Sequence, residues 1–66
     1  MTGTIKRMIR ARGFGFITDE DGQEVFFHRS ELVNVDFDDL NEGDEVTFEV
    51  EQSPKGLRAA RVQPAE

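Results

Sequence analysis

Four flat side chains stand two residues apart in pairs, and their chemistry is stacking rather than bond making. Phe14 and Phe16 are separated by one glycine, and Phe26 and His28 are separated by one residue. Residues two apart in a β-strand share a face, so each pair points to one side of its strand. Flat rings on a sheet surface form a platform on which unpaired bases stack. The spacing therefore predicts an aromatic binding surface.

The segment between the two pairs predicts that they lie on adjacent strands. Residues 18–24 are polar and contain an Asp-Gly dipeptide, which is typical of hairpin turns. A hairpin here gathers the four rings on one face and turns Ile17, Val25 and Phe27 toward a core. An ordinary antiparallel sheet is apolar on one face only. The surplus of aromatic residues thus favours a binding surface, although Phe14 and Phe16 have a second interpretation as core residues.

The sequence offers no arrangement for catalysis or metal binding. It has no Cys and one His, so the usual ligand sets of a zinc site are missing. Ser30 lies two residues after His28, but no third group is placed beside them, so we expect no enzyme. The run Asp19 to Gly22 resembles the start of a calcium loop, but Phe26 and Phe27 fall where oxygen ligands belong. We predict no metal and no cofactor.

Two motifs in order make the chain resemble the cold-shock domain family. The family motifs read Lys-Gly-Phe-Gly-Phe-Ile and Val-Phe-Val-His, and this chain has Arg12 to Ile17 and Val25 to His28. The resemblance, to a bacterial single-domain member, runs from about Gly3 to Val62 and includes Leu40 to Phe48 and the late Lys55-Gly56. It implies an all-β fold, a small five-stranded antiparallel Greek-key barrel of the oligonucleotide-binding type.

The resemblance also implies a function and a set of site residues. The function is binding of single-stranded RNA or DNA, pyrimidine-rich strands preferred, in an RNA-chaperone role without catalysis. Phe37 matches a position that is aromatic and base-contacting in the family, and basic residues are expected at the rim, near phosphates. The expected nucleic-acid-binding residues are Lys6, Arg7, Met8, Arg12, Phe14, Phe16, Phe26, His28, Arg29, Phe37 and Lys55, with Arg10 as a further rim cation.

Four positions depart from the family pattern. Arg7, Met8 and Ile9 stand where members usually have Trp, Phe and Asn, and Arg29 stands where bacterial members often have Phe. Losing three full stacking contacts would cost about 3–9 kcal/mol if the losses were additive. Arginine planes also stack on bases and attract phosphate, and Met8 keeps an apolar contact. We expect a site shifted from stacking toward charge. Alternatively, Arg7 and Arg29 pair with Glu24, Glu31 or another carboxylate.

The net charge of −6 opposes nucleic-acid binding unless the charges are separated. All four basic residues of the stretch Lys6 to Arg12 precede every acid, and most acids fall in 19–24 and 36–51. With a screening length of about 8 Å at physiological salt, a basic strip acts independently of a distant acidic side. We expect weaker binding and slower association than a basic homologue would show.

Sixty-six residues allow one domain, 1–66, with its core at about 3–62 and a tail at 63–66. Strand patterns fall at 3–9, 13–18, 23–28, 45–51 and 57–62, with a bulge near Arg7 and Met8. Ser30 is the predicted N-cap of a short helical turn. The predicted core residues are Ile5, Ile17, Val25, Phe27, Leu32, Leu40, Val46, Phe48, Val50, Ala60 and Val62.

A rival interpretation keeps the barrel and changes its partner. An exposed patch of Phe side chains also marks protein contacts, and fold alone does not fix function. The rival is a protein-interaction or self-associating domain with a weakened nucleic-acid face. We expect a monomer, and a dimer formed through the aromatic face is a variant of the rival. The sequence shows no membrane span and no signal-peptide start, so we predict a cytoplasmic protein that contacts no membrane.

Overall fold

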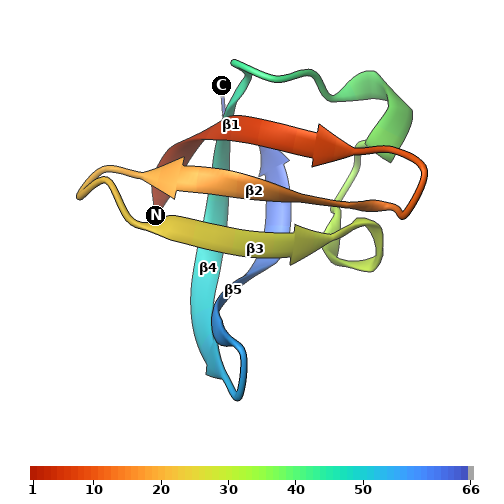
Figure 1. The fold of residues 1–66 in the computed structure, drawn as a ribbon. Coiled ribbons are helices and arrows are strands. Elements are labelled where there is room, and N and C mark those ends of the chain that lie inside the picture. The colour runs from red at the N-terminus through yellow and green to blue at the C-terminus, as the bar shows by residue number, and fades with distance from the viewer. Residues whose placement is uncertain (66) are drawn as a thin grey trace.

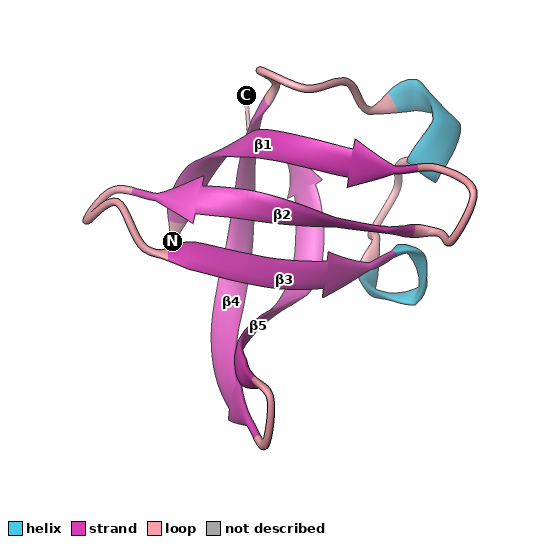
Figure 2. Ribbon diagram, viewed as in Figure 1, coloured by secondary structure: helices cyan, strands magenta, loops and turns pink. Residues whose placement is uncertain are grey.

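The computed structural model describes residues 1–65, and within them five strands close into a barrel (Figure 1). In Figure 1, the first three strands form the front layer and the last two cross behind them, with the core between. Two turns of 3-10 helix lie in the long connection between the layers (Figure 2). The elements are β1 (Thr2–Ile9), β2 (Phe14–Asp19), β3 (Glu24–His28), η1 (Arg29–Glu31), η2 (Phe37–Asp39), β4 (Glu45–Ser53) and β5 (Gly56–Pro64).

The strand order around the barrel is β1-β2-β3-β5-β4, and β4 pairs with β1 to close it. Because β4 returns beside β1 and not beside β3, the predicted Greek-key connection is confirmed. The prediction that the sheet is antiparallel throughout is wrong at one place in residues 1–65. There β3 runs parallel to β5, joined through Phe26 and Arg58. A closed ring with an odd number of strands cannot alternate direction at every seam, so one parallel pair is unavoidable.

The barrel interior is filled by the residues that alternation assigns to it. Ile17, Val25 and Phe27 are fully shielded from solvent, since the β2–β3 register turns them inward together. Leu32 and Val50 are half-buried and pack against this core. The predicted core residues that are buried are Ile5, Ile17, Val25, Phe27, Leu40, Val46, Phe48, Ala60 and Val62.

The last strand departs from the predicted alternation. Ala60 is buried, but Ala59 and Val62 are the residues that pack in the core cluster. Two residues of β5 lie opposite Phe48, and Arg61 has a φ of 54°. This bulge shifts the side-chain phase by one residue, which period-two reasoning does not foresee. Residues 63 and 64 of the predicted tail belong to β5, whereas residue 66 lies outside the described residues.

No helix of residues 1–65 has the length and apolarity needed to cross a membrane.

Candidate nucleic-acid interface

Three phenylalanine rings form one cluster on the outer surface of β2 and β3. The ring centroids of Phe14 and Phe26 are 5.3 Å apart, and each is 6.0 Å from the centroid of Phe16. Phe16 lies opposite Phe26, and Phe14 lies opposite His28. The four predicted platform residues therefore share a face, and all four are half-buried. The interpretation of Phe14 and Phe16 as core residues is wrong.

Gly15 explains how a flat strand supports rings on one side and a core ring on the other. A Cβ atom at Gly15 would lie 2.6 Å from the carbonyl oxygen of Arg7 and 2.8 Å from Cε1 of Phe27. The missing side chain therefore lets Phe27 pack directly beneath β2. The outer rings of Phe14 and Phe16 stand on this tightly packed backbone.

An open groove of about 750 Å³ runs beside the aromatic cluster. One wall is the aromatic face of β2 and β3, continued by His28 and Ser30. The other wall belongs to the β4–β5 hairpin, which extends past β3 at the bottom of Figure 1. The groove is mainly apolar, with cations on the hairpin side. Its lining from the hairpin consists of Ser53, Pro54, Lys55, Leu57 and Arg58.

The orientation of His28 is set by its neighbour Ser30. The Nδ1 atom of His28 accepts a hydrogen bond from the backbone N–H of Ser30 at 3.1 Å and lies 3.0 Å from the Ser30 hydroxyl. His28 is thus the N-cap of η1, and the prediction that Ser30 is the cap is wrong. Because Nδ1 accepts, we assign the proton of the neutral ring to Nε2. That N–H stays free to donate to a ligand.

A bulge in β1 places two cations side by side on the outside of the barrel. The β1–β2 register shifts between Ile5 and Arg7, so the bulge falls at Lys6, just before the predicted position. Lys6 and Arg7 are consequently both exposed, although neighbours in a regular strand point to opposite faces. Arg7 pairs in register with Phe16, so it borders the aromatic cluster.

The eight Lys and Arg residues divide into two equal groups within residues 1–65. Those that form ion pairs with carboxylates are Lys6, Arg10, Arg58 and Arg61. Those that form no ion pair with a described carboxylate are Arg7, Arg12, Arg29 and Lys55. All of the second group are sequence-predicted site residues.

The alternative partners of Arg7 and Arg29 are occupied. Glu24 pairs with Lys6 at 3.0 Å, and Glu31 pairs with Arg58. The interpretation of Arg7 and Arg29 as partners of these carboxylates is therefore wrong, and both guanidinium groups remain available to a ligand.

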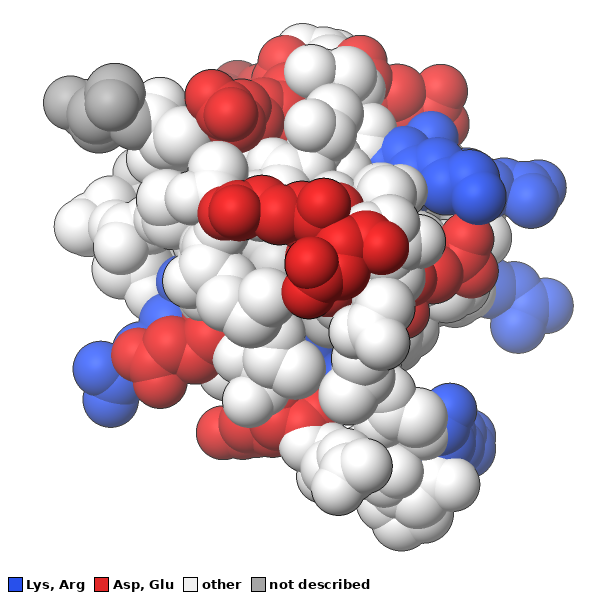
Figure 3. Space-filling model, turned by 90° about the vertical axis from the view of Figure 1, so that its left-hand side faces the viewer, with Lys and Arg blue, Asp and Glu red and all other residues white. Residues whose placement is uncertain are grey.

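The charges are segregated over the surface. Figure 3 looks onto the end of the barrel where the β2–β3 turn lies, and acidic side chains cover its middle and top. Lys and Arg lie at the margins, most of them on the right, which is the side of β1, β2 and β3. The negative net charge thus resides largely away from the aromatic face.

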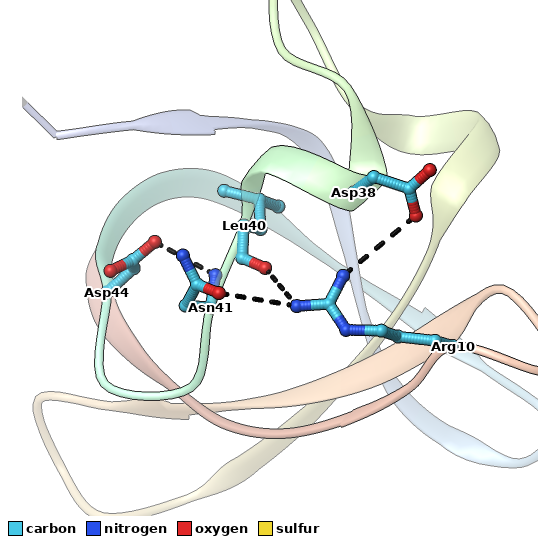
Figure 4. Close-up of polar contacts among 5 residues, drawn as sticks. All are labelled: Arg10, Asp38, Leu40, Asn41 and Asp44. Carbon is cyan, nitrogen blue, oxygen red and sulfur yellow. Dashed lines mark hydrogen bonds and ion pairs between the residues drawn. The ribbon is translucent and has the colours of Figure 1, made fainter.

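Three predicted site residues lie apart from the groove. Met8 and Phe37 are partly buried and pack against the core, and the ring centroid of Phe37 is 6.2 Å from that of Phe27. Arg10, predicted as a rim cation, donates instead from Nη2 to the carbonyl oxygen of Leu40 at 2.7 Å (Figure 4). Base contacts at Met8 and Phe37 stay predictions.

Arg58 is a groove residue that sequence reasoning missed. It reaches the groove because β5 lies beside β3, where Arg58 pairs in register with Phe26. Its Nη2 donates to Glu31 at 2.5 Å, and its Nε is buried with no partner among residues 1–65. No local pattern marks this position, because the two paired residues are far apart in the sequence.

Comparisons with known proteins agree with this architecture. The profile of the 'Cold-shock' DNA-binding domain family matches residues 1–65. The cold shock-like protein CspA of Shewanella violacea is 50% identical over 62 residues, which cover 92% of this chain and 89% of that protein. The cold shock protein CspC of Bacillus subtilis is 46% identical over 63 residues, 96% of each chain.

A solved structure shares the fold. It is described as drosophila Unr CSD456 and matches with a TM-score of 0.76 at 29% identity. The match covers 98% of this chain and 26% of that longer chain. With the family match over residues 1–65 and the bacterial relatives, these findings identify the fold and the chemistry of its surface. The chain belongs to the cold-shock domain family, and it is a nucleic-acid-binding protein of the RNA-chaperone type and not an enzyme.

Proposed function

We propose that this protein binds single-stranded RNA or DNA as a monomer, with the strand lying along the groove beside Phe14, Phe16 and Phe26. Pyrimidine-rich strands are the preferred ligands. The location is cytoplasmic, as the sequence predicts. The observation that carries the proposal is the outward-facing aromatic cluster, bordered by cations that no described carboxylate neutralises.

The aromatic cluster supports a preference for single strands. A duplex hides the faces of its bases, whereas an unpaired strand can place one base on each exposed ring. Each stacked base contributes about 1–3 kcal/mol. Three Phe rings therefore contribute about 3–9 kcal/mol before the cost of ordering the strand, which brackets the roughly 8 kcal/mol of a micromolar complex.

The unpaired cations supply the second contribution. Arg7, Arg12, Arg29 and Lys55 each have a charge available to a phosphate. Four phosphate contacts on a single strand predict a slope near −3 for the logarithm of the association constant against that of the salt concentration. The pair of Lys6 and Glu24 has side chains 62% and 52% exposed, so a phosphate can displace Glu24 at little cost.

The RNA-chaperone role follows from mass action. A protein that binds only unpaired segments lowers the free energy of the melted state of a weak hairpin. Open stacking surfaces release their bases quickly, since the groove covers one side of the strand only. Melting therefore needs no energy source and no catalytic group.

The test is fluorescence anisotropy with a labelled pyrimidine-rich heptamer at about 20 mM and about 150 mM salt, which changes the screening length strongly. Saturable micromolar binding that weakens about 400-fold across this range agrees with the slope of −3. A purine-rich heptamer tests the pyrimidine preference. Absence of binding at low salt, from a protein shown to be folded, refutes the proposal and favours the protein-interaction rival.

A further inference from the structure

Arg10 connects the β1–β2 turn to a segment 30 residues away. Its Nη2 atom donates to the carbonyl oxygen of Leu40 at 2.7 Å and lies 3.4 Å from Oδ1 of Asn41. Its Nη1 atom lies 3.9 Å from Oδ1 of Asp38. Figure 4 shows the guanidinium group pointing toward the loop, with the three partners arranged around it. All of these contacts fall on η2 and the residues that follow it.

The contacted segment is the turn that carries Phe37. The backbone N–H of Leu40 donates to the carbonyl oxygen of Phe37 at 3.2 Å and closes η2. Leu40 is buried, and its own carbonyl is the group that Arg10 binds. Asn41 is held in turn, because its backbone N–H donates to Asp44 at 2.9 Å. Arg10 therefore secures η2 at its C-terminal end.

Fixing η2 also fixes a ring next to the platform support. The Phe37 ring packs against Phe27, and Phe27 is the core ring that lies directly beneath Gly15. Gly15 separates Phe14 from Phe16 on the outer face. A chain of direct contacts thus runs from Arg10 through η2 to the backbone that supports the aromatic cluster.

We propose that Arg10 is a positioning residue, which holds η2 and Phe37 in the binding-competent arrangement and does not act as a phosphate ligand. The inference rests on the proposed binding function. It separates Arg10 from Arg12, which lies in the same turn and forms no ion pair with a described carboxylate. A guanidinium group that already donates to a buried residue's carbonyl loses that bond when it turns to a phosphate.

The test compares R10Q with the matched control R12Q, in full-length protein, by anisotropy with the same heptamer at several salt concentrations. A lost phosphate contact makes the slope shallower by about 0.7 on a single strand. R12Q is expected to show this change. R10Q is expected to keep the wild-type slope and to bind about fivefold more weakly at every salt concentration, as for loss of one modest base contact.

A second readout needs no ligand. Exchange of the Leu40 amide hydrogen reports on the hydrogen bond that closes η2. It is expected to quicken at least fivefold in R10Q and to stay unchanged in R12Q. R10K, which retains a donor for the Leu40 carbonyl, is expected to restore part of the protection, and it takes the place of R10Q should that variant not fold.

A slope that becomes shallower in R10Q by about as much as in R12Q overturns the proposal, and so does wild-type exchange of the Leu40 amide in R10Q. Failure of the proposed function is a different result. In that case the wild-type protein binds no heptamer, while the exchange comparison still decides whether Arg10 holds η2.

Discussion

Replacing Phe26 by Leu tests the aromatic surface most directly. The Phe26 ring lies 5.3 Å from Phe14 and 6.0 Å from Phe16, so it stands within the cluster. Leucine keeps an apolar side chain at this half-buried position and removes the flat face on which a base stacks. One stacked base contributes about 1–3 kcal/mol, so the Kd for the heptamer is expected to rise about 5- to 160-fold.

The same substitution also lowers stability, and the two effects must be measured separately. Phe26 takes part in two aromatic pairs, each worth about 0.5–1.5 kcal/mol beyond area burial, so the loss is about 1–3 kcal/mol. Urea unfolding gives the free energy of unfolding, and anisotropy is then recorded where each variant is more than about 95% folded, which requires roughly 2 kcal/mol of stability.

Phe48→Leu is the matched control. Phe48 is 3% exposed inside the barrel, so the same chemical change lowers stability there without touching the outer face. Its Kd is expected to stay within twofold of wild type. Wild-type affinity in folded Phe26→Leu, or equal weakening in both variants, would refute the reasoning that a ring on this face binds a base.

Three further substitutions test charge, packing and turn structure. Glu24→Gln removes the carboxylate that pairs with Lys6, so binding at low salt is expected to tighten by up to about fivefold, within the 1 kcal/mol of a surface pair; unchanged anisotropy would show that Lys6 contacts no phosphate. Gly15→Ala introduces a Cβ atom 2.6 Å from a backbone carbonyl oxygen, and it is expected to cost about 1–3 kcal/mol of stability in urea unfolding; wild-type stability would mean that β2 yields freely. Asp19→Ala removes a buried carboxylate that accepts from the backbone N–H groups of Asp21 at 2.9 Å and Gln23 at 2.8 Å, so we expect a loss of about 1–3 kcal/mol with an unchanged Kd; thermal unfolding at the wild-type midpoint would contradict this role.

Sequence pattern alone was sufficient for the two faces of the β2–β3 hairpin. Phe14 and Phe16 point outward and Ile17 points inward because alternation is a property of the local backbone. The polar Asp-Gly turn joins the two strands in the register that brings Phe16 opposite Phe26. These inferences need only neighbours a few residues apart, and for that reason they could be made before the structure.

Local bulges set a limit to this reasoning. The irregularity at Lys6 exposes two consecutive cations, and the one near Arg61 exchanges the roles of Ala59 and Ala60 in the core. A bulge arises where one strand must bend to close the barrel. Its position therefore depends on the partner strand, which a single stretch of sequence does not specify.

The sequence by itself determined which residues could stack on bases, because residue type and period-two spacing are local. The tertiary structure decided which charged residues join them. The β3–β5 seam brings Arg58 beside Phe26, and folding of the long loop gives Arg10 a partner at Leu40. Which cation meets which carboxylate depends on contacts between distant segments, and only closure of the barrel brings those segments together.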